Sequence, residues 1–183
     1  QLRRIQQPKE GTARSEAADP LGKLLGELER LADEEPEHYA TFWDEFGVFL
    51  KEGIATEPAD SDRLAGLLRF HSTYNADADA PAVTLADYVG RMNDDQDAIY
   101  YILADDVASV AHSPHLDPFN ARDIEVLIMT ETVDSFMLMN LSEYQGKSLQ
   151  NVDDADIELP EADDTGEADA ERPEKLDEEP FEQ

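Results

Sequence analysis

Two short apolar segments constrain the fold of this chain more than any other feature. Residues 98–103 form an unbroken run of apolar and aromatic side chains, and residues 124–129 form a second run with one polar member. Short runs rich in β-branched and aromatic residues are typical of strands that are buried on both faces of a sheet. The 20 residues between them are too many for a hairpin and enough for one crossover helix. The pair therefore predicts a parallel βαβ unit with a right-handed crossover.

A third strand completes the predicted sheet. Residues 148–152 follow the second strand after a gap of 18 residues, within which a helix is predicted to begin at Thr132 or Asp134 and to end near Leu141. The predicted fold class is α/β: a helical connector over residues 21–93, then a small three-stranded parallel α/β/α subdomain over residues 94–152. Residues 1–20 are predicted to be a divergent or disordered junction. Residues 153–183 hold fifteen acidic and two basic side chains, which predicts an acidic disordered tail.

The connector shows the spacing of amphipathic helices. A first helix is predicted to carry a leucine stripe between Leu21 and Leu31, with Asp19 as its N-cap and Pro20 in its first turn. A second helix is predicted to follow Pro36 and to stop at Gly53, because glycine is common just after a helix end. Its large side chains are predicted to form one packed face: Tyr39, Phe42, Trp43, Phe46, Phe49 and Leu50.

Two shorter helices are predicted in the rest of the connector. One carries an apolar stripe that includes Leu64, Leu67, Leu68 and Phe70. The other begins at Thr84, where Asp87 three residues later resembles a capping box with aspartate in place of glutamate.

The charge balance excludes several classes of partner. The net charge of −30 argues against nucleic acid and anionic membrane, because both need a positive field on the protein. No apolar stretch approaches the roughly 20 residues of a membrane helix, and no signal peptide opens the chain. The chain contains no cysteine, so it can form neither disulfides nor Cys-ligated metal sites. We expect a cytoplasmic protein.

No catalytic, cofactor-binding or metal-binding motif is complete in this sequence. The scattered glycines form no phosphate-binding loop, and no serine lies in a GxSxG turn. The run Asn75-Ala-Asp-Ala-Asp79 lacks the glycine and the closing glutamate of a calcium loop. His112 and His115 lack a third ligand at a fixed spacing. We therefore expect no catalytic residue, no cofactor and no metal in this segment.

Several short stretches in a constant order give the chain a resemblance to a known family. The longest are Tyr39-Ala-Thr-Phe-Trp-Asp-Glu-Phe-Gly47 and Leu85-Ala-Asp-Tyr-Val-Gly-Arg-Met92. In order and spacing they resemble the C-terminal two-thirds of the middle domain of the heat-shock protein 90 chaperones, most closely the bacterial form, over roughly residues 26–152. The other matching stretches are residues 26–32, 50–53, 67–70, 96–102, 113–116, 124–127, 133–134 and 146–147.

The resemblance implies a fragment of an ATP-dependent molecular chaperone that assists protein folding under stress. In the family, ATP and Mg²⁺ bind an N-terminal domain, and a middle-domain arginine in a Ser-Arg-Glu motif contacts the γ-phosphate. That motif is missing here, so we expect that the fragment alone neither holds a cofactor nor hydrolyses ATP. The family's C-terminal dimerisation domain is also missing, which implies a monomeric fragment of a homodimeric parent protein.

The resemblance also implies a surface that binds client proteins. In bacterial relatives an exposed aromatic residue in the helix after the second strand contacts clients, and Phe136 has the corresponding position. Together with Met137, Leu138 and Met139 it forms an adaptable apolar cluster that suits many partners. The expected partners are unfolded or partly folded clients, with co-chaperones as further candidates. The alternative is that Phe136 and Met139 pack onto the sheet.

Two other functions are compatible with the sequence. One is a stand-alone receiver-like or ligand-binding α/β domain, in which Asp105 and Asp106 after the first strand would hold Mg²⁺. This hypothesis rests on fold-level analogy alone. The other is an acidic adaptor that binds its partner through residues 153–183.

Overall fold

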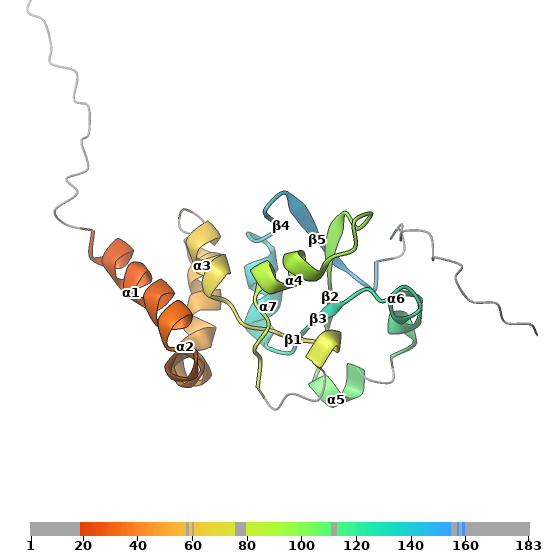
Figure 1. The fold of residues 1–183 in the computed structure, drawn as a ribbon, viewed down its shortest axis with the longest axis horizontal. Coiled ribbons are helices and arrows are strands. Elements are labelled where there is room, and N and C mark those ends of the chain that lie inside the picture. The colour runs from red at the N-terminus through yellow and green to blue at the C-terminus, as the bar shows by residue number, and fades with distance from the viewer. Residues whose placement is uncertain are drawn as a thin grey trace, which may run out of the picture.

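The computed structural model describes residues 19–57, 59, 61–75, 80–110, 113–154, 157 and 159. The predicted junction before Asp19, most of the acidic tail, His112, and both aspartates of the calcium-like run lie outside the described residues. In the described part, three helices stand to one side of a sheet, which the other helices cover (Figure 1).

Three parallel strands form the centre of the sheet, as predicted. They are β2 (Ala98–Leu103), β3 (Val126–Met129) and β5 (Lys147–Asn151). Tyr100 pairs with Val126 on one side of β2, and Ala98 pairs with Ser148 on the other, both in parallel register. The apolar runs of β2 and β3 thus reflect two central strands with side chains in a core on each face.

The sheet is mixed and five-stranded rather than parallel and three-stranded, with the order β1-β3-β2-β5-β4. Two edge strands are antiparallel to their neighbours: β1 (His71–Ser72) pairs with β3, and β4 (Glu143–Tyr144) pairs with β5. Each has only two residues, too few to show the alternation by which a strand is recognised in sequence. The segment between β3 and β5 therefore holds both the predicted helix, α7 (Thr132–Leu138), and a short hairpin.

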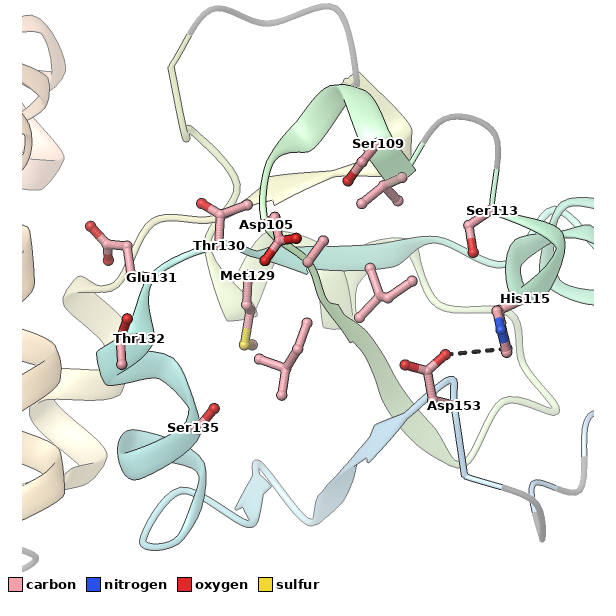
Figure 2. Close-up of a pocket in the computed structure, with 14 residues that line it drawn as sticks. Asp105, Ser109, Ser113, His115, Met129, Thr130, Glu131, Thr132, Ser135 and Asp153 are labelled. Atoms are coloured by element: carbon pink, nitrogen blue, oxygen red, sulfur yellow. Dashed lines mark ion pairs between the residues drawn. The ribbon is translucent and has the colours of Figure 1, made fainter.

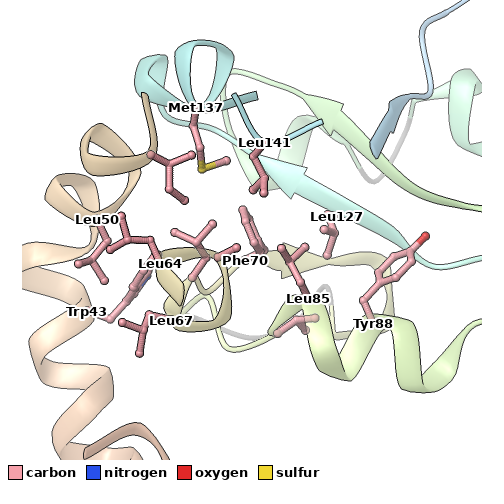
Figure 3. Close-up of a cluster of buried hydrophobic side chains, with 14 of the residues drawn as sticks. Trp43, Leu50, Leu64, Leu67, Phe70, Leu85, Tyr88, Leu127, Met137 and Leu141 are labelled. Atoms are coloured by element: carbon pink, nitrogen blue, oxygen red, sulfur yellow. The ribbon is translucent and has the colours of Figure 1, made fainter. Parts of the chain in front are cut away.

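The two faces of the sheet belong to separate cores. Leu127 and Met129 of β3 point to the core shared with the connector helices and α7, part of which Figure 3 shows. Val126 and Ile128 point to the opposite core. That second core is covered by three short helices, α5 (Val107–Val110), η3 (Pro114–Leu116) and α6 (Asp117–Asn120), and by the side chains of Ile157 and Leu159.

The connector begins with α1 (Pro20–Glu34) and α2 (Pro36–Thr56). The predicted cap is confirmed, because Asp19 Oδ1 accepts the backbone N–H of Gly22 at 3.0 Å. The prediction that α2 stops at Gly53 is wrong, since the helix continues to Thr56. Gly53 instead permits close helix packing: a Cβ atom there would lie 3.2 Å from Leu64 Cδ1.

The remaining connector elements are α3 (Ser61–Leu67), η2 (Thr73–Asn75) and α4 (Leu85–Arg91). Phe70, predicted to lie on the third helix, lies beyond its end, and its backbone pairs with Val83 in an isolated antiparallel bridge. The capping box predicted at α4 is confirmed: Thr84 Oγ1 accepts the Asp87 N–H at 2.9 Å, and Asp87 Oδ2 accepts the Thr84 N–H at 3.2 Å.

Candidate functional site

The four residues predicted to contact clients occupy the C-terminal half of α7 and the residue after it. The helix begins directly after β3, where Asp134 Oδ2 accepts the backbone N–H of Glu131 at 2.9 Å. Successive residues of a helix are rotated by about 100° from one another, so four consecutive side chains cannot share one face. The structure accordingly separates the cluster into exposed and buried members.

Phe136 and Met139 are the exposed members, with 58% and 78% of their surface accessible. Met137 is fully buried in the core that also contains Leu50 and Leu141 (Figure 3). Leu138 is partly buried against the same core. The structure therefore offers Phe136 and Met139 for contact with a partner and places Met137 in the fold's interior.

A row of aromatic side chains on α2 extends this apolar surface. The ring centroids of Phe42 and Phe46 lie 5.4 Å apart, and those of Phe46 and Phe49 lie 6.3 Å apart. Phe46 is 51% exposed and Phe49 is 59% exposed, so the prediction that all the large side chains of this helix form one packed face is wrong for these two. Trp43, by contrast, is buried as predicted.

The sequence held a signal for this surface. Phe42, Phe46 and Phe49 lie four and three residues apart and so follow one line along the helix. A neighbouring line along the same helix holds Tyr39, Trp43 and further large side chains. An apolar surface this wide exceeds what one core face needs and indicates a second, exposed stripe.

A groove of about 1040 Å³ lies at the surface where α2 and α7 meet. Phe49 lines it from α2 and Phe136 lines it from α7. The other lining residues come from the C-terminal half of α2, from the turn between β3 and α7, and from the first two residues of α7: Val48, Glu52, Gly53, Ala55, Thr56, Thr130, Glu131, Thr132 and Val133.

Polar contacts hold the two sides of this groove together. The Lys51 ammonium forms ion pairs with Glu131 and Asp134. The Asn140 side-chain amide donates to the carbonyl oxygens of Ile54 and Ala55 at 3.1 and 2.8 Å. These contacts join α2 to both ends of the α7 segment, so the groove is part of the fold itself.

A second hollow, of about 790 Å³, lies at the carboxyl ends of β2 and β3, where the ion-binding alternative placed its site (Figure 2). Asp105 lines it, whereas Asp106 Oδ1 accepts the backbone N–H of Ser109 at 2.8 Å at the start of α5. His115 Nδ1 lies 3.2 Å from Asp153 Oδ1. Among the described residues no three His, Asp or Glu side chains gather where they could hold a metal ion, so this hollow does not favour the alternative.

No helix in the described ranges is both long and apolar enough to cross a membrane.

The comparisons with known proteins agree with one another. A model of the family described as Hsp90 protein matches residues 21–181. The chaperone protein HtpG of Shewanella sediminis is 47% identical over 148 residues, which are 81% of this chain and 23% of that protein. HtpG of Chromobacterium violaceum is 47% identical over 150 residues, 82% of this chain and 24% of that protein. The chain thus spans about a quarter of the length of the curated relatives it matches.

A solved structure gives the same result. The middle domain of a heat shock protein from Plasmodium falciparum matches with a TM-score of 0.67 and 28% identity, covering 72% of this chain and 53% of that one. The resemblance drawn from the short sequence stretches is confirmed, as is the α/β fold class, although the sheet is mixed rather than wholly parallel. The chain belongs to the Hsp90 family.

Proposed function

We propose that this chain is the C-terminal part of the middle domain of an ATP-dependent chaperone and that it contacts unfolded or partly folded client proteins. The surface that we assign to this contact is centred on Phe136 and Met139. The observation that carries the assignment is the exposure of Phe136 on α7 and of Met139 at its end, although Met137 between them is fully buried.

Physical chemistry supports this assignment. A phenylalanine and a methionine at the surface gain free energy when a partner covers them, by roughly 25 cal/mol for each Å² of apolar surface removed from water. Methionine also adapts its shape to different partners, which suits a surface that binds many sequences weakly. Exposed apolar patches on soluble domains commonly mark such interaction sites.

The other parts of the chaperone cycle are assigned to the rest of the longer protein. In this proposal ATP and Mg²⁺ bind outside this segment, client contact here is coupled to that ATPase cycle, and the parent protein is a cytoplasmic homodimer that co-chaperones can bind. The segment by itself is a monomer without ATPase activity.

The test compares alanine variants of exposed side chains. Phe136→Ala and Met139→Ala should each leave the free energy of unfolding within about 0.5 kcal/mol of the parent chain, because both side chains are exposed. Each should weaken the binding of a chemically unfolded, alkylated model protein, measured by fluorescence anisotropy. Leu24→Ala is the matched control, since Leu24 on α1 is 56% exposed and lies outside α7.

The two measurements together decide the proposal. Unchanged affinity in the Phe136→Ala and Met139→Ala variants would refute the client contact. A stability loss of about 3 kcal/mol or more for Phe136→Ala would mark a core residue instead. Equal weakening by Leu24→Ala would show that the model protein binds exposed apolar side chains without regard to site.

A further inference from the structure

We propose that the groove between α2 and α7 binds partner segments in which large apolar side chains are flanked by lysine or arginine. This inference rests on the proposed client contact at α7 and adds both the second wall of the site and the chemistry of the segment that it accepts.

The two walls of the groove each present one exposed aromatic ring. Phe49 on α2 is 59% exposed, and Phe136 on α7 is 58% exposed. Between them the apolar lining is small or branched: Val48, Gly53, Ala55 and Val133. A volume of about 1040 Å³ is slightly above the usual range of ligand sites, roughly 300–1000 Å³, and is large enough for several side chains of a peptide.

The groove is preformed, which lowers the entropic cost of binding. Its two helices are joined by the buried ammonium of Lys51, which pairs with Glu131 and Asp134, and by the Asn140 amide, which donates to two carbonyl oxygens at the end of α2. A partner segment therefore meets a fixed site, and only the segment has to become ordered.

The electrostatic character of the groove is negative. Glu52 and Glu131 line it, and no lysine, arginine or histidine is among the described residues that line it. Lys51, whose ammonium pairs with the groove residue Glu131 and with Asp134, is only 5% exposed. Glu52 thus leaves a carboxylate on this surface that a partner cation can approach.

The helix end adds to this negative potential. α2 ends at Thr56, which lines the groove, and its last turn contains no basic residue. The C-terminal end of a helix carries a partial negative charge from its free carbonyl groups and favours nearby cations. The net charge of −30 extends the same preference over a longer range, because it steers cationic segments toward the chain and repels acidic ones. The chain's own acidic tail is excluded as the occupant for the same reason.

The experiment uses the full chain and two fluorescently labelled 12-residue peptides. Both carry leucine and phenylalanine at the same helical spacing, and the polar positions are lysine in one and glutamate in the other. A third peptide keeps the lysines and replaces the apolar residues by alanine. We expect the lysine peptide to bind at least tenfold more tightly than the other two, and its affinity to fall as salt rises.

Variants then locate the binding. Phe49→Ala and Phe136→Ala should each weaken the lysine peptide about fivefold or more, and Glu52→Gln should weaken it by about threefold. Glu143→Gln is the matched charge control, because Glu143 on β4 is exposed and does not line the groove. It should leave the affinity unchanged, as should Leu24→Ala.

The outcomes separate this inference from the proposed function. Equal affinity for the lysine and glutamate peptides, or no effect of Phe49→Ala, would overturn the groove inference. In that case a loss of unfolded-protein binding in Phe136→Ala would still support the client contact at α7. If Phe136→Ala changes neither the peptide affinity nor the binding of the unfolded protein, both proposals fail.

Discussion

The ammonium of Lys51 on α2 lies 2.8 Å from Asp134 Oδ1 on α7, and the two side chains are 6% and 0% exposed. The contact is an ion pair without hydrogen-bond alignment, since Oδ1 has no hydrogen-bond partner among the described residues, whereas Oδ2 accepts the Glu131 N–H. The same ammonium lies 5.8 Å from the ring centroid of Trp43 and 5.7 Å from that of Phe70. A buried cation thus joins the connector to the α/β subdomain.

Removing one partner of this pair should destabilise the chain strongly. Lys51→Met keeps the volume of the side chain but leaves the carboxylate of Asp134 buried without its cation, a change that typically costs about 3–5 kcal/mol. Urea unfolding monitored by the fluorescence of Trp43 measures the loss. The double variant Lys51→Met with Asp134→Leu should recover most of it, because neither charge then remains in the interior. A loss below about 1 kcal/mol in the single variant would contradict this assignment.

Two glycines should respond to alanine with opposite signs. Gly47 lies in α2 against the indole of Trp43, and a Cβ atom there would come within 2.8 Å of Trp43 Cδ2 and Cε2. Gly47→Ala should therefore cost about 1–3 kcal/mol through overpacking. Gly66 in α3 has no atom within 4 Å of such a Cβ, so Gly66→Ala should stabilise the chain by about 0.5–1 kcal/mol through helix propensity. Thermal unfolding of the two variants checks the signs, and stabilisation by both would mean that the indole can move aside.

The sequence predicted the features whose signal lies within a few consecutive residues. β2 and β3 were recognisable because both of their faces are buried, which requires apolar residues without alternation. The cap at Thr84 was recognisable because its hydrogen bonds join residues three apart in sequence. The crossover length then determined that the strands are parallel.

The candidate site was predicted only in part, for a physical reason. Phe136 and Met137 are neighbours in sequence, yet one faces solvent and the other the core, and only the orientation of α7 on the sheet decides which. Phe49 was assigned to the core because an apolar side chain at helical spacing usually packs inward. Its exposure depends on where α7 crosses α2, and the ion pairs of Lys51 that fix this crossing join residues far apart in the chain.

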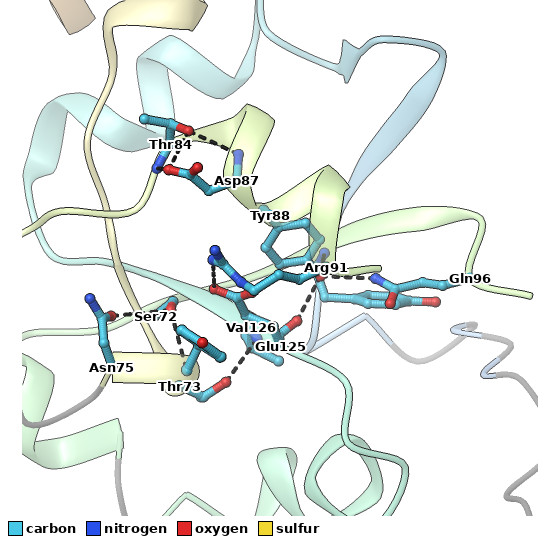
Figure 4. A network of polar contacts seen from close by, with 12 residues as sticks. Ser72, Thr73, Asn75, Thr84, Asp87, Tyr88, Arg91, Gln96, Glu125 and Val126 are labelled. Carbon is cyan, nitrogen blue, oxygen red and sulfur yellow. Dashed lines mark hydrogen bonds and ion pairs between the residues drawn. The ribbon is translucent and has the colours of Figure 1, made fainter. Parts of the chain in front are cut away.

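The hydroxyl of Tyr88 is the centre of a buried network (Figure 4). It donates to the Glu125 carbonyl oxygen at 2.6 Å and accepts hydrogen bonds from Gln96 Nε2 and the Tyr100 backbone N–H, each at 3.0 Å. Burial raises the pKa of Tyr88, so the hydroxyl keeps the proton that it donates. The network connects α4 to β2 and to the residue before β3.

Tyr88→Phe should cost about 2–3 kcal/mol, because it leaves buried backbone and amide groups without a partner. The free energy of unfolding in urea measures this cost. Tyr74→Phe is the control: Tyr74 is 69% exposed, and its ring contact with the Arg91 guanidinium, 4.3 Å from the centroid, does not need the hydroxyl. A cost for Tyr88→Phe no greater than that of the control would show that water replaces the hydroxyl.

His71 should make stability depend on pH in a defined direction. It lies in β1 opposite Ile128, and its Nδ1 is buried without a hydrogen bond from the described residues. Burial, and secondarily the charge of Lys51, lower the pKa of His71 below its ordinary value of 6.5. As pH falls below about 6.5, the unfolded chain therefore takes up a proton before the folded chain does. The stability that neutral His71 contributes is fully present above that pH and declines below it.

The variant His71→Gln removes this contribution, so its free energy of unfolding should fall less than that of the parent chain between pH 7.5 and pH 5.5. The comparison of slopes is needed because the many carboxylates also begin to titrate in the lower part of this range. His38→Gln provides the matched control, since its side chain is 75% exposed on α2. This variant reports the effect of a histidine-to-glutamine change at an exposed position. If the pH dependence of His71→Gln instead runs parallel to those of the parent chain and of His38→Gln, the imidazole of His71 is protonated equally in the folded and unfolded chains. Its burial beside Lys51 then has no effect on folding.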